Sequence, residues 1–228
     1  MLAIFPFAGE GRRFTQRGYT LPKPFLPHAG KPLIGWALQS VSLLHPAGYE
    51  FLCQDTLTDF PATLIFPEGC WHVLDHPTRS PLHTVLEAQA CLDTHQDVLI
   101  CDCDSFLDPQ ELAQAVSLFR ETKASGGVTI RRTQDPACAY VEVDSEWRVK
   151  VAREKEVISP WSCTGPYWFR SGQEFLKAAR QALASQEASI APVYNFLGGV
   201  TRAVPVATFQ HLGTPEAYET AQEALRHA

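Results

Sequence analysis

Short apolar runs alternate with stretches of helical periodicity along the first half of the chain. Leu2 to Phe7 is an apolar run that ends before Gly9, and residues 33 to 44 carry apolar side chains three and four positions apart, as on one face of a helix. Further apolar runs predict strands at Phe51 to Cys53, Ala62 to Phe66, Asp97 to Cys103 and Val128 to Arg132. This alternation predicts an α/β fold, with a mostly parallel sheet, helices on both faces and a site at the carboxyl ends of the strands.

Two connecting segments begin with residues that favour helix starts. Ser80 precedes Pro81, so a hydroxyl cap is followed by a proline in the first turn. Asp108 precedes Pro109, and Glu111 places a carboxylate at the third helical position. Both segments therefore suit helices that cross over between parallel strands.

The pattern changes after about residue 133. Residues 139 to 144 and 148 to 153 alternate apolar with polar side chains around a polar turn, which predicts an antiparallel hairpin. The rest predicts a strand at Thr164 to Phe169, a helix opened by Ser171 and Glu174, a strand near 203 to 207 and a helix capped by Thr214 before Pro215. No linker composition separates these parts, so we expect one domain over residues 1–228, with halves at 1–133 and 134–228.

Composition and charge exclude several classes of protein. The 228 residues are 45% hydrophobic and 19% charged, as in an ordinary globular protein, and the net charge of -6 argues against a general binder of nucleic acid or of membrane surfaces. The amino terminus has no charged segment before a long apolar stretch, and no run of about 18 apolar residues occurs. Seven scattered cysteines predict reduced thiols rather than a disulfide framework. We expect a cytoplasmic protein.

The stretch FAGEGRRFTQRGYTLPKPF, residues 7 to 25, is a glycine-rich loop behind the first predicted strand. Glycines there allow backbone N–H groups to approach a phosphate closely. A dinucleotide fingerprint would need a third glycine where Phe14 stands and a helix that begins at once, and a Walker loop would need Ser or Thr after Gly-Lys, where Pro32 stands. A third arrangement remains, with Gly9, Gly11 and Arg13 on the turn and Lys23 brought back toward it.

That stretch, continued through LPHAGKPLI, resembles the signature of the sugar-phosphate nucleotidyltransferases, roughly AGxGxRF followed by PKPL and GKP. The resemblance implies a single Rossmann-like nucleotidyltransferase domain with a mixed, mostly parallel sheet. It implies that residues 8 to 12 cradle an NTP and that Arg13 and Lys23 stabilise the reacting phosphates. The nucleotide-binding residues that it implies are Ala8, Gly9, Glu10, Gly11, Arg12 and Ser80.

The segment VLICDCDSF carries two aspartates, Asp102 and Asp104, at the end of an apolar run. Two-residue alternation places both on one face, with the two cysteines opposite. Carboxylate oxygens suit Mg²⁺, and in the resembled family the aspartate at the position of Asp104 binds the catalytic metal. Asp102 is a second metal ligand or a hydrogen-bonded structural carboxylate. A zinc site is a weaker alternative for the soft side chains Cys70, His72, His76, Cys101 and Cys103.

The carboxyl half also resembles the family. A hairpin is followed by Glu154 and Lys155 and then by a Thr-Gly-x-Tyr-x-Phe strand that contains Gly165. The resemblance implies that these three residues bind the sugar phosphate: a carboxylate accepts hydrogen bonds from hydroxyl groups and an ammonium meets phosphate. Residues 1–133 would then bind the nucleotide and residues 134–228 the sugar phosphate.

The chain departs from the family pattern at two places. Many members carry a metal-binding aspartate where this chain has His211, and imidazole is a poor Mg²⁺ ligand. The segment from Thr78 to Leu82 differs from the usual glycine-rich base-binding turn and leaves the nucleobase open. We expect transfer of an NMP from an NTP to a sugar 1-phosphate with Mg²⁺. The alternatives are a non-sugar acceptor such as phosphocholine or a polyol phosphate, and a homologue that binds nucleotide sugars without turnover.

Overall fold

The computed structural model describes residues 1–54 and 69–226. The strand predicted at Ala62 to Phe66 lies outside the described residues. Nine strands of the described part form one sheet with a path of β10-β9-β11-β6-β1-β4-β5, and β8 lies between β11 and β12. Their bounds are β1 Leu2–Pro6, β4 Gly48–Gln54, β5 Cys70–Leu74, β6 Val98–Ile100, β8 Gly126–Arg132, β9 Ala139–Val143, β10 Val149–Glu154, β11 Trp161–Phe169 and β12 Thr201–Pro205.

The sheet is mixed. The four strands β5, β4, β1 and β6 run parallel, as the first half of the sequence predicts. Strand β11 pairs antiparallel with β6 and with β8, while β12 returns parallel to β8. The predicted hairpin is present as β9 and β10, which pair antiparallel. The parallel first half thus continues into a second half that contains both antiparallel and parallel pairs.

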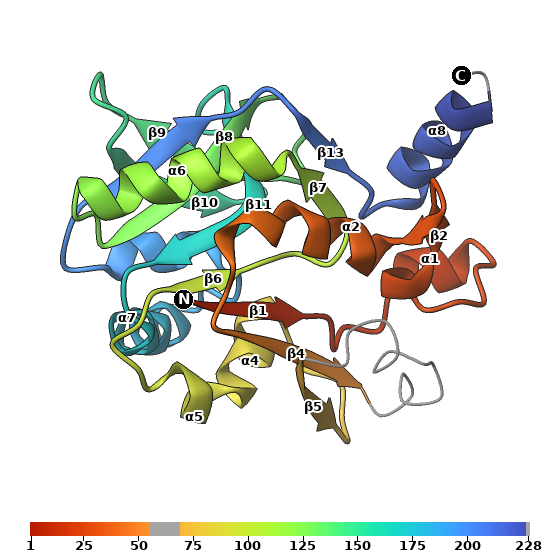
Figure 1. Cartoon of the computed structure of the whole chain (residues 1–228), viewed down its shortest axis with the longest axis horizontal. Coiled ribbons are helices and arrows are strands. Elements are labelled where there is room, and N and C mark those ends of the chain that lie inside the picture. Colours follow the sequence, from red (N-terminus) through yellow and green to blue (C-terminus); the bar gives the residue numbers. More distant parts are fainter. Residues whose placement is uncertain (55–68, 227–228) are drawn as a thin grey trace.

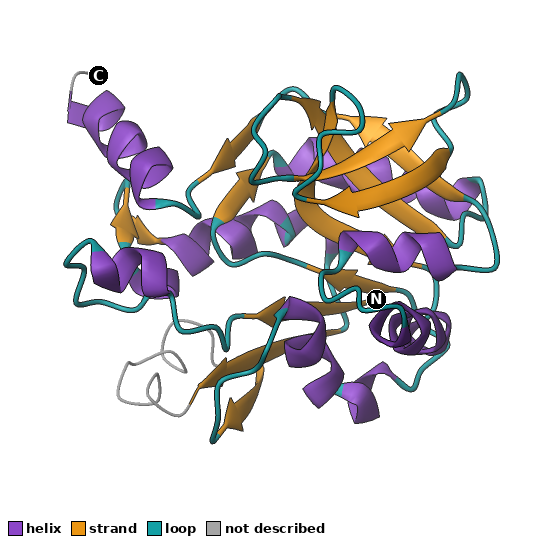
Figure 2. Ribbon diagram, turned by 180° about the vertical axis from the view of Figure 1, so that it is seen from behind, coloured by secondary structure: helices purple, strands orange, loops and turns teal. Residues whose placement is uncertain are grey.

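Helices cover both faces of this sheet (Figures 1 and 2). On one face α2 Leu33–Ser40 and α6 Pro109–Glu121 pack on a core that includes Phe5, Phe51 and Trp168. On the other face α4 Pro81–Glu87, α5 Gln89–Leu92, α7 Gly172–Ala184 and the 3₁₀ helix η4 Ala191–Phe196 pack on Ile4, Leu52 and neighbours. None of the helices in the described ranges combines the length and apolarity needed to cross a bilayer.

A third, smaller core joins the two ends of the described chain. It contains Phe14, Leu26, Leu33, Leu212 and Tyr218. The elements involved are α1 Arg12–Gln16, η1 Lys23–Phe25, the small sheet of β2 Pro27–His28 with β3 Lys31–Pro32, and α8 Pro215–Arg226. Figure 1 shows α8 beside α1 and β2. The C-terminal helix therefore packs directly on the glycine-rich loop region.

All four predicted helix caps are present. The hydroxyls of Ser80 and Ser171 accept hydrogen bonds from the amides of His83 and Glu174, and the Thr214 hydroxyl accepts from Ala217. The Asp108 carboxylate accepts from the first-turn amides of α6. Glu111 has a different role, because its carboxylate accepts from the amides of Ala207 and Thr208. It fixes the segment that leads into β13 Phe209–His211.

Two elements are shorter than the sequence predicted, and one short helix was not predicted. The helix predicted over residues 33 to 44 ends at Ser40, and the 3₁₀ helix η2 Ser42–Leu44 follows it. His45, at φ 45°, ends η2 before Pro46. The strand predicted over 97 to 103 has only three residues, since β1 pairs only with Val98–Ile100. The short helix α1 begins directly after Gly11, as a dinucleotide-binding loop would require. Phe14 in place of the third glycine still excludes such a loop.

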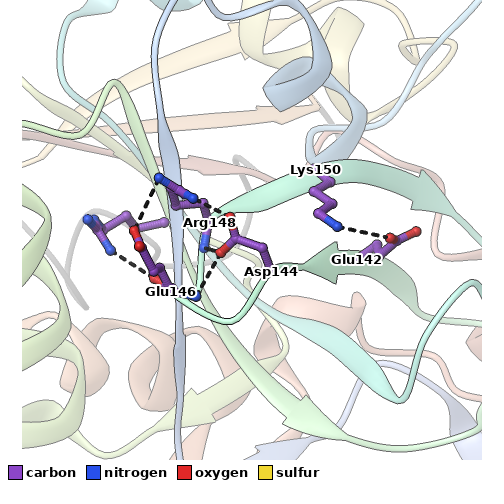
Figure 3. Close-up of polar contacts among 6 residues, drawn as sticks. Glu142, Asp144, Glu146, Arg148 and Lys150 are labelled. Carbon is purple, nitrogen blue, oxygen red and sulfur yellow. Dashed lines mark hydrogen bonds and ion pairs between the residues drawn. The ribbon is translucent and has the colours of Figure 1, made fainter.

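Charged residues close the β9–β10 hairpin (Figure 3). The Asp144 carboxylate accepts from the amides of Glu146 and Arg148 and from Nε of Arg148 at 2.7 Å. Trp147, at φ 60°, forms the tight part of this turn. Lys150 pairs with Glu142 across the two strands at 3.9 Å. The turn is thus held mainly by one carboxylate.

Candidate active site

The glycine-rich loop follows β1 at the carboxyl edge of the parallel strands. Ala8 is fully buried, and its carbonyl accepts a hydrogen bond of 2.6 Å from Nε2 of Gln54 at the end of β4. Gly9 is exposed, and a side chain there would meet no atom within 4 Å. Gly11 has φ 62°, a left-handed conformation that favours glycine. The loop therefore presents open backbone toward the cavity described below.

Lys23 and Asp104 meet across this edge, as expected for a loop and a strand tip that follow neighbouring parallel strands. Nζ of Lys23 lies 2.6 Å from Oδ2 of Asp104, and both side chains are largely buried. Burial opposes the charged form of each group, but their mutual attraction outweighs it. The pKa of Lys23 therefore lies above its ordinary value and the pKa of Asp104 below it. The pair stays ionised over the physiological range.

Asp102 and Asp104 follow the end of β6, and both face the same cavity. Burial and then the Asp104 charge raise the pKa of Asp102 to about 8. The backbone approaches these carboxylates closely: a Cβ at Gly165, where φ is 102°, would stand 2.5 Å from Oδ2 of Asp102, and one at Gly213 would overlap Asp104. Two crowded, buried carboxylates with hard oxygen donors fit a divalent cation such as Mg²⁺.

The larger cavity has a volume of about 610 Å³. It runs from the glycine-rich loop across Lys23 and the two aspartates to the start of α4. Its polar or backbone-exposing lining includes Gly9, Glu10, Gly11, Lys23, Gln54, Thr78, Arg79, Ser80, Asp102 and Asp104. These are the parts expected for nucleotide binding, and they all come from residues 1–133.

A smaller cavity of about 160 Å³ adjoins the first, and Pro81 and Asp102 line both. Its lining includes Arg13, Arg131, Asp135, Glu154, Gly165, Ser189 and His211. Burial raises the pKa of Glu154, although the charge of Lys155 opposes that shift. Two guanidinium groups and a half-buried carboxylate therefore line a second cavity that meets the first at Asp102.

Two predicted binding residues point elsewhere. Arg12 is exposed and pairs with Glu10, also exposed, instead of lining either cavity. Lys155 is exposed and has φ 55°. Its positive charge lowers the pKa of Glu154, against the effect of burial. The roles of Arg12 and Lys155 in binding stay predictions.

His211 occupies the position at which an aspartate was expected. Strand β13 pairs antiparallel with β7 Ser105–Leu107, which sets His211 opposite Ser105 and beside Asp104. Burial lowers the pKa of His211, although the Asp104 carboxylate favours the charged form. A neutral imidazole thus replaces a negative charge at this side of the site.

Arg131 and Gln54 also line the two cavities, although neither was predicted from the sequence. Both lie within predicted or observed strands and point their polar groups to the carboxyl edge of the sheet. Nε of Arg131 is buried and has no hydrogen-bond partner, while its guanidinium lies 4.9 Å from the ring of Phe209. An arginine at an otherwise buried strand position was the available signal.

The zinc hypothesis was wrong in its choice of ligands. Cys101 and Cys103 are buried in the core beneath α2 and α6. Cys70 and His72 lie on β5, where alternation from Trp71 turns them to the opposite face of the sheet. His76 is exposed and pairs with Asp75. The five residues do not form one site.

Comparison with known proteins agrees with this geometry. A family model for the MobA-like NTP transferase domain matches residues 3–195, and the chain belongs to this family of nucleotidyltransferases. A nucleoside-diphosphate-sugar pyrophosphorylase from Vibrio cholerae RC9 superposes with a TM-score of 0.81 at 23% identity, covering 98% of this chain and 100% of that one.

Two further solved structures have the same fold. A UDP-glucose pyrophosphorylase complexed with UDP-glucose has a TM-score of 0.81 at 18% identity, covering 99% of this chain and 98% of its own. An inositol-1-phosphate CTP transferase from T. maritima has a TM-score of 0.77 at 14% identity, covering 100% and 96%. These matches confirm the predicted α/β nucleotidyltransferase fold.

Proposed function

We propose that this NTP transferase joins an NMP to a sugar 1-phosphate, giving a nucleotide sugar and pyrophosphate. The observation that carries the proposal is the pair of adjoining cavities that share Asp102. One has the volume and the glycine-rich wall for an NTP, and the other has cations for a second phosphate. The proposal assigns the nucleotide to residues 1–133 and most contacts of the acceptor to residues 134–228, within a single domain.

The smaller cavity supports a phosphate-bearing acceptor. Arg13 and Arg131 both line it, and the unpartnered Nε of Arg131 is a donor that a phosphate oxygen would satisfy. Glu154 and Ser189 on its wall suit the hydroxyl groups of a sugar, because carboxylate and hydroxyl oxygens accept hydrogen bonds from them. Gly165 also lines this cavity, and its backbone lies close to Asp102.

In the proposed reaction, an oxygen of the acceptor phosphate attacks the α-phosphorus of the NTP. A bond forms between that oxygen and the α-phosphorus, and the bond from the α-phosphorus to the oxygen bridging to the β-phosphorus breaks, so pyrophosphate leaves. The attacking oxygen is already anionic at neutral pH, so no general base is needed. Positioning and charge neutralisation are the tasks left to the protein.

Lys23 and Arg13 supply fixed positive charge for these tasks. Lys23 lies beside the glycine-rich loop and keeps its proton because of Asp104, and Arg13 lies on the acceptor side. The loop amides add oriented dipoles. Asp104 and Asp102 would hold Mg²⁺, which when bound neutralises charge on the triphosphate.

The test is a matrix of NTPs and acceptor phosphates with the purified chain and Mg²⁺, read by pyrophosphate release and by mass spectrometry of the product. We expect one NTP with one sugar 1-phosphate to give stoichiometric pyrophosphate and nucleotide sugar. Pyrophosphate release with phosphocholine or a polyol phosphate, and with no sugar phosphate, would show that the acceptor is not a sugar. The fold match to the inositol-1-phosphate CTP transferase supports this candidate.

A chain that binds without turnover is the remaining candidate, and His211 in the place of a metal-binding aspartate favours it. A thermal shift with an NTP, but no pyrophosphate with any acceptor under Mg²⁺ or Mn²⁺, would establish it. His211→Asp separates the two cases further, since restored turnover in that variant would identify the imidazole as the cause.

A further inference from the structure

Three side chains that carry metal-ligand atoms meet at the far edge of the sheet, away from both cavities, and Cys70 lies beside them. Glu50 lies on β4, Cys70 and His72 on the edge strand β5, and Cys91 on α5. The parallel register sets Glu50 opposite Cys70 and Leu52 opposite His72. Because strand side chains alternate, these residues share one face of the sheet, the face that α5 covers.

The donor atoms of this cluster are close enough to share one ion. Nε2 of His72 lies 2.5 Å from Oε2 of Glu50 and 3.9 Å from Sγ of Cys91, and the donor atoms of these three residues all lie within 4.8 Å of one another. Ligands at zinc's usual bond lengths and tetrahedral angles stand about 3.3–3.8 Å apart. Small side-chain rotations would therefore bring the three donors to zinc-binding distances.

Cys70 supplies a fourth donor. It stands opposite Glu50 in the register of β4 with β5 and shares its face of the sheet, and burial, followed by the charge of Glu50, raises the pKa of the Cys70 thiol. The same causes raise the pKa of the Cys91 thiol. A bound cation reverses this effect, since zinc binds cysteine as the thiolate. The cluster thus contains a buried carboxylate, an imidazole and two thiols, with both thiols next to the carboxylate.

We propose that Glu50, Cys70, His72 and Cys91 bind a zinc ion that ties the edge strand β5 to β4 and α5. Two sulfur donors, one nitrogen and one oxygen suit zinc, and they do not suit the hard cation Mg²⁺. None of the four residues lines either cavity, so the ion is separate from the reaction. It fixes β5 just before the segment from Thr78 to Ser80 that lines the nucleotide cavity.

The experiment is a Co²⁺ titration of the untagged, fully reduced chain after removal of metals with a chelator. We expect thiolate-to-cobalt charge-transfer bands and tetrahedral visible bands that saturate at one Co²⁺ per chain, and that one equivalent of Zn²⁺ abolishes. Metal analysis of the zinc-loaded chain would give one zinc. Absence of these bands in the folded wild-type chain would overturn the proposal.

Matched variants assign the ligands. Cys91→Ser and His72→Gln are expected to weaken Zn²⁺ binding at least about 100-fold, because even outer-shell changes cost 10- to 100-fold. Cys53→Ala removes a thiol from β4 on the opposite face, and Asp104→Asn alters the active site; both should keep the bands. Loss of the bands in Cys53→Ala, or their survival in Cys91→Ser, would contradict the assignment. A Cys70–Cys91 disulfide, in a chain that binds no metal after reduction, would also contradict it.

Discussion

Single residues set the charge of the site, and Asp104 is the clearest case. Its carboxylate touches Lys23 and lies beside His211, and it is the residue expected to hold the metal. Asp104→Asn keeps the shape of the side chain and a hydrogen-bond acceptor for Lys23. We predict a loss of about 10²- to 10³-fold or more in the rate of pyrophosphate release. Asp108→Asn, four residues away at the cap of α6, should keep the wild-type rate. Normal Mg²⁺-dependent turnover in Asp104→Asn would refute the metal assignment.

Arg131 tests the division of the site into two cavities. Its guanidinium lines only the smaller one. Arg131→Gln should raise the KM for the acceptor phosphate about 10- to 100-fold, because it removes a hydrogen bond between charged groups. It should leave the KM for the NTP unchanged. Steady-state kinetics with each substrate varied in turn measures both constants. Arg132→Gln is the control, because this neighbour is exposed and lies over Trp161. Equal effects on both KM values would contradict the assignment.

The backbone of Gly165 lies against Asp102, one of the two carboxylates proposed to hold the metal. Its φ of 102° disfavours any side chain, and a Cβ would crowd Asp102. We predict that Gly165→Ala lowers the free energy of unfolding by about 1–3 kcal/mol and also lowers turnover. Urea denaturation and pyrophosphate release measure the two effects. Gly198→Ala, where a Cβ would meet nothing within 4 Å, should change neither. An unaffected Gly165→Ala variant would show that the local backbone adapts.

At the scale of elements, the β9–β10 hairpin depends on one carboxylate, Asp144 (Figure 3). The amide of Arg148, and then its guanidinium, lower the pKa of Asp144 to about 2 from an ordinary value of 3.8. A lowered pKa means that folding favours the ionised form. The contribution to stability is therefore complete above about pH 4 and is lost as the pH falls toward 2.

NMR titration of the Asp144 carboxyl carbon checks this prediction. Arg148→Met should raise the pKa of Asp144 only part of the way toward 3.8, because the backbone hydrogen bonds remain. Lys150→Met removes a cation that pairs with Glu142 instead and should leave the pKa of Asp144 unchanged. A wild-type value near 3.8 would show that the turn is open in solution.

Local signals in the sequence predicted most elements, and long-range pairing decided the rest. The caps at Ser80 and Asp108 depend on neighbours within four residues, so they were predictable. The meeting of Lys23 with Asp104 was also predictable, because loops at the carboxyl ends of adjacent parallel strands share one edge. Strand β13 is a three-residue strand that forms only because β7 pairs with it, so the placement of His211 needed the structure.

The cysteine and histidine residues show the same limit. The type of side chain alone grouped Cys70 and His72 with Cys101 and Cys103. The register of β4 with β5 and the packing of α5 instead bring Glu50 and Cys91 to them. Neither contact can be seen in the local sequence, because β5 pairs with a strand that precedes it by about 20 residues.

At the scale of the whole molecule, α8 fixes the loop that follows β1. Tyr218 is buried, donates a hydrogen bond of 2.6 Å to the carbonyl of Pro27 and packs edge-on against Phe14 and Tyr19. Glu219 also accepts from Tyr19 and pairs with Arg17. The glycine-rich loop region is therefore held in part by a helix 200 residues away in the sequence.

Tyr218→Ala should thus act on nucleotide binding at a distance. We predict a loss of about 3 kcal/mol in the free energy of unfolding and a raised KM for the NTP, with a smaller effect on the KM for the acceptor. Urea denaturation and steady-state kinetics below the unfolding transition measure these quantities. Thr220→Ala, at an exposed position of α8, should change neither value. A destabilised variant with an unchanged KM for the NTP would show that the loop holds its shape without α8.

The packing of α8 on Phe14 and Leu26 also has a consequence for biosynthesis. This helix follows every other described element in chain order, so it is the last of them to leave the ribosome. Until then, the glycine-rich loop region of a nascent chain lacks the surface against which it packs. Translation must therefore pass Tyr218 before the glycine-rich loop region can pack against α8.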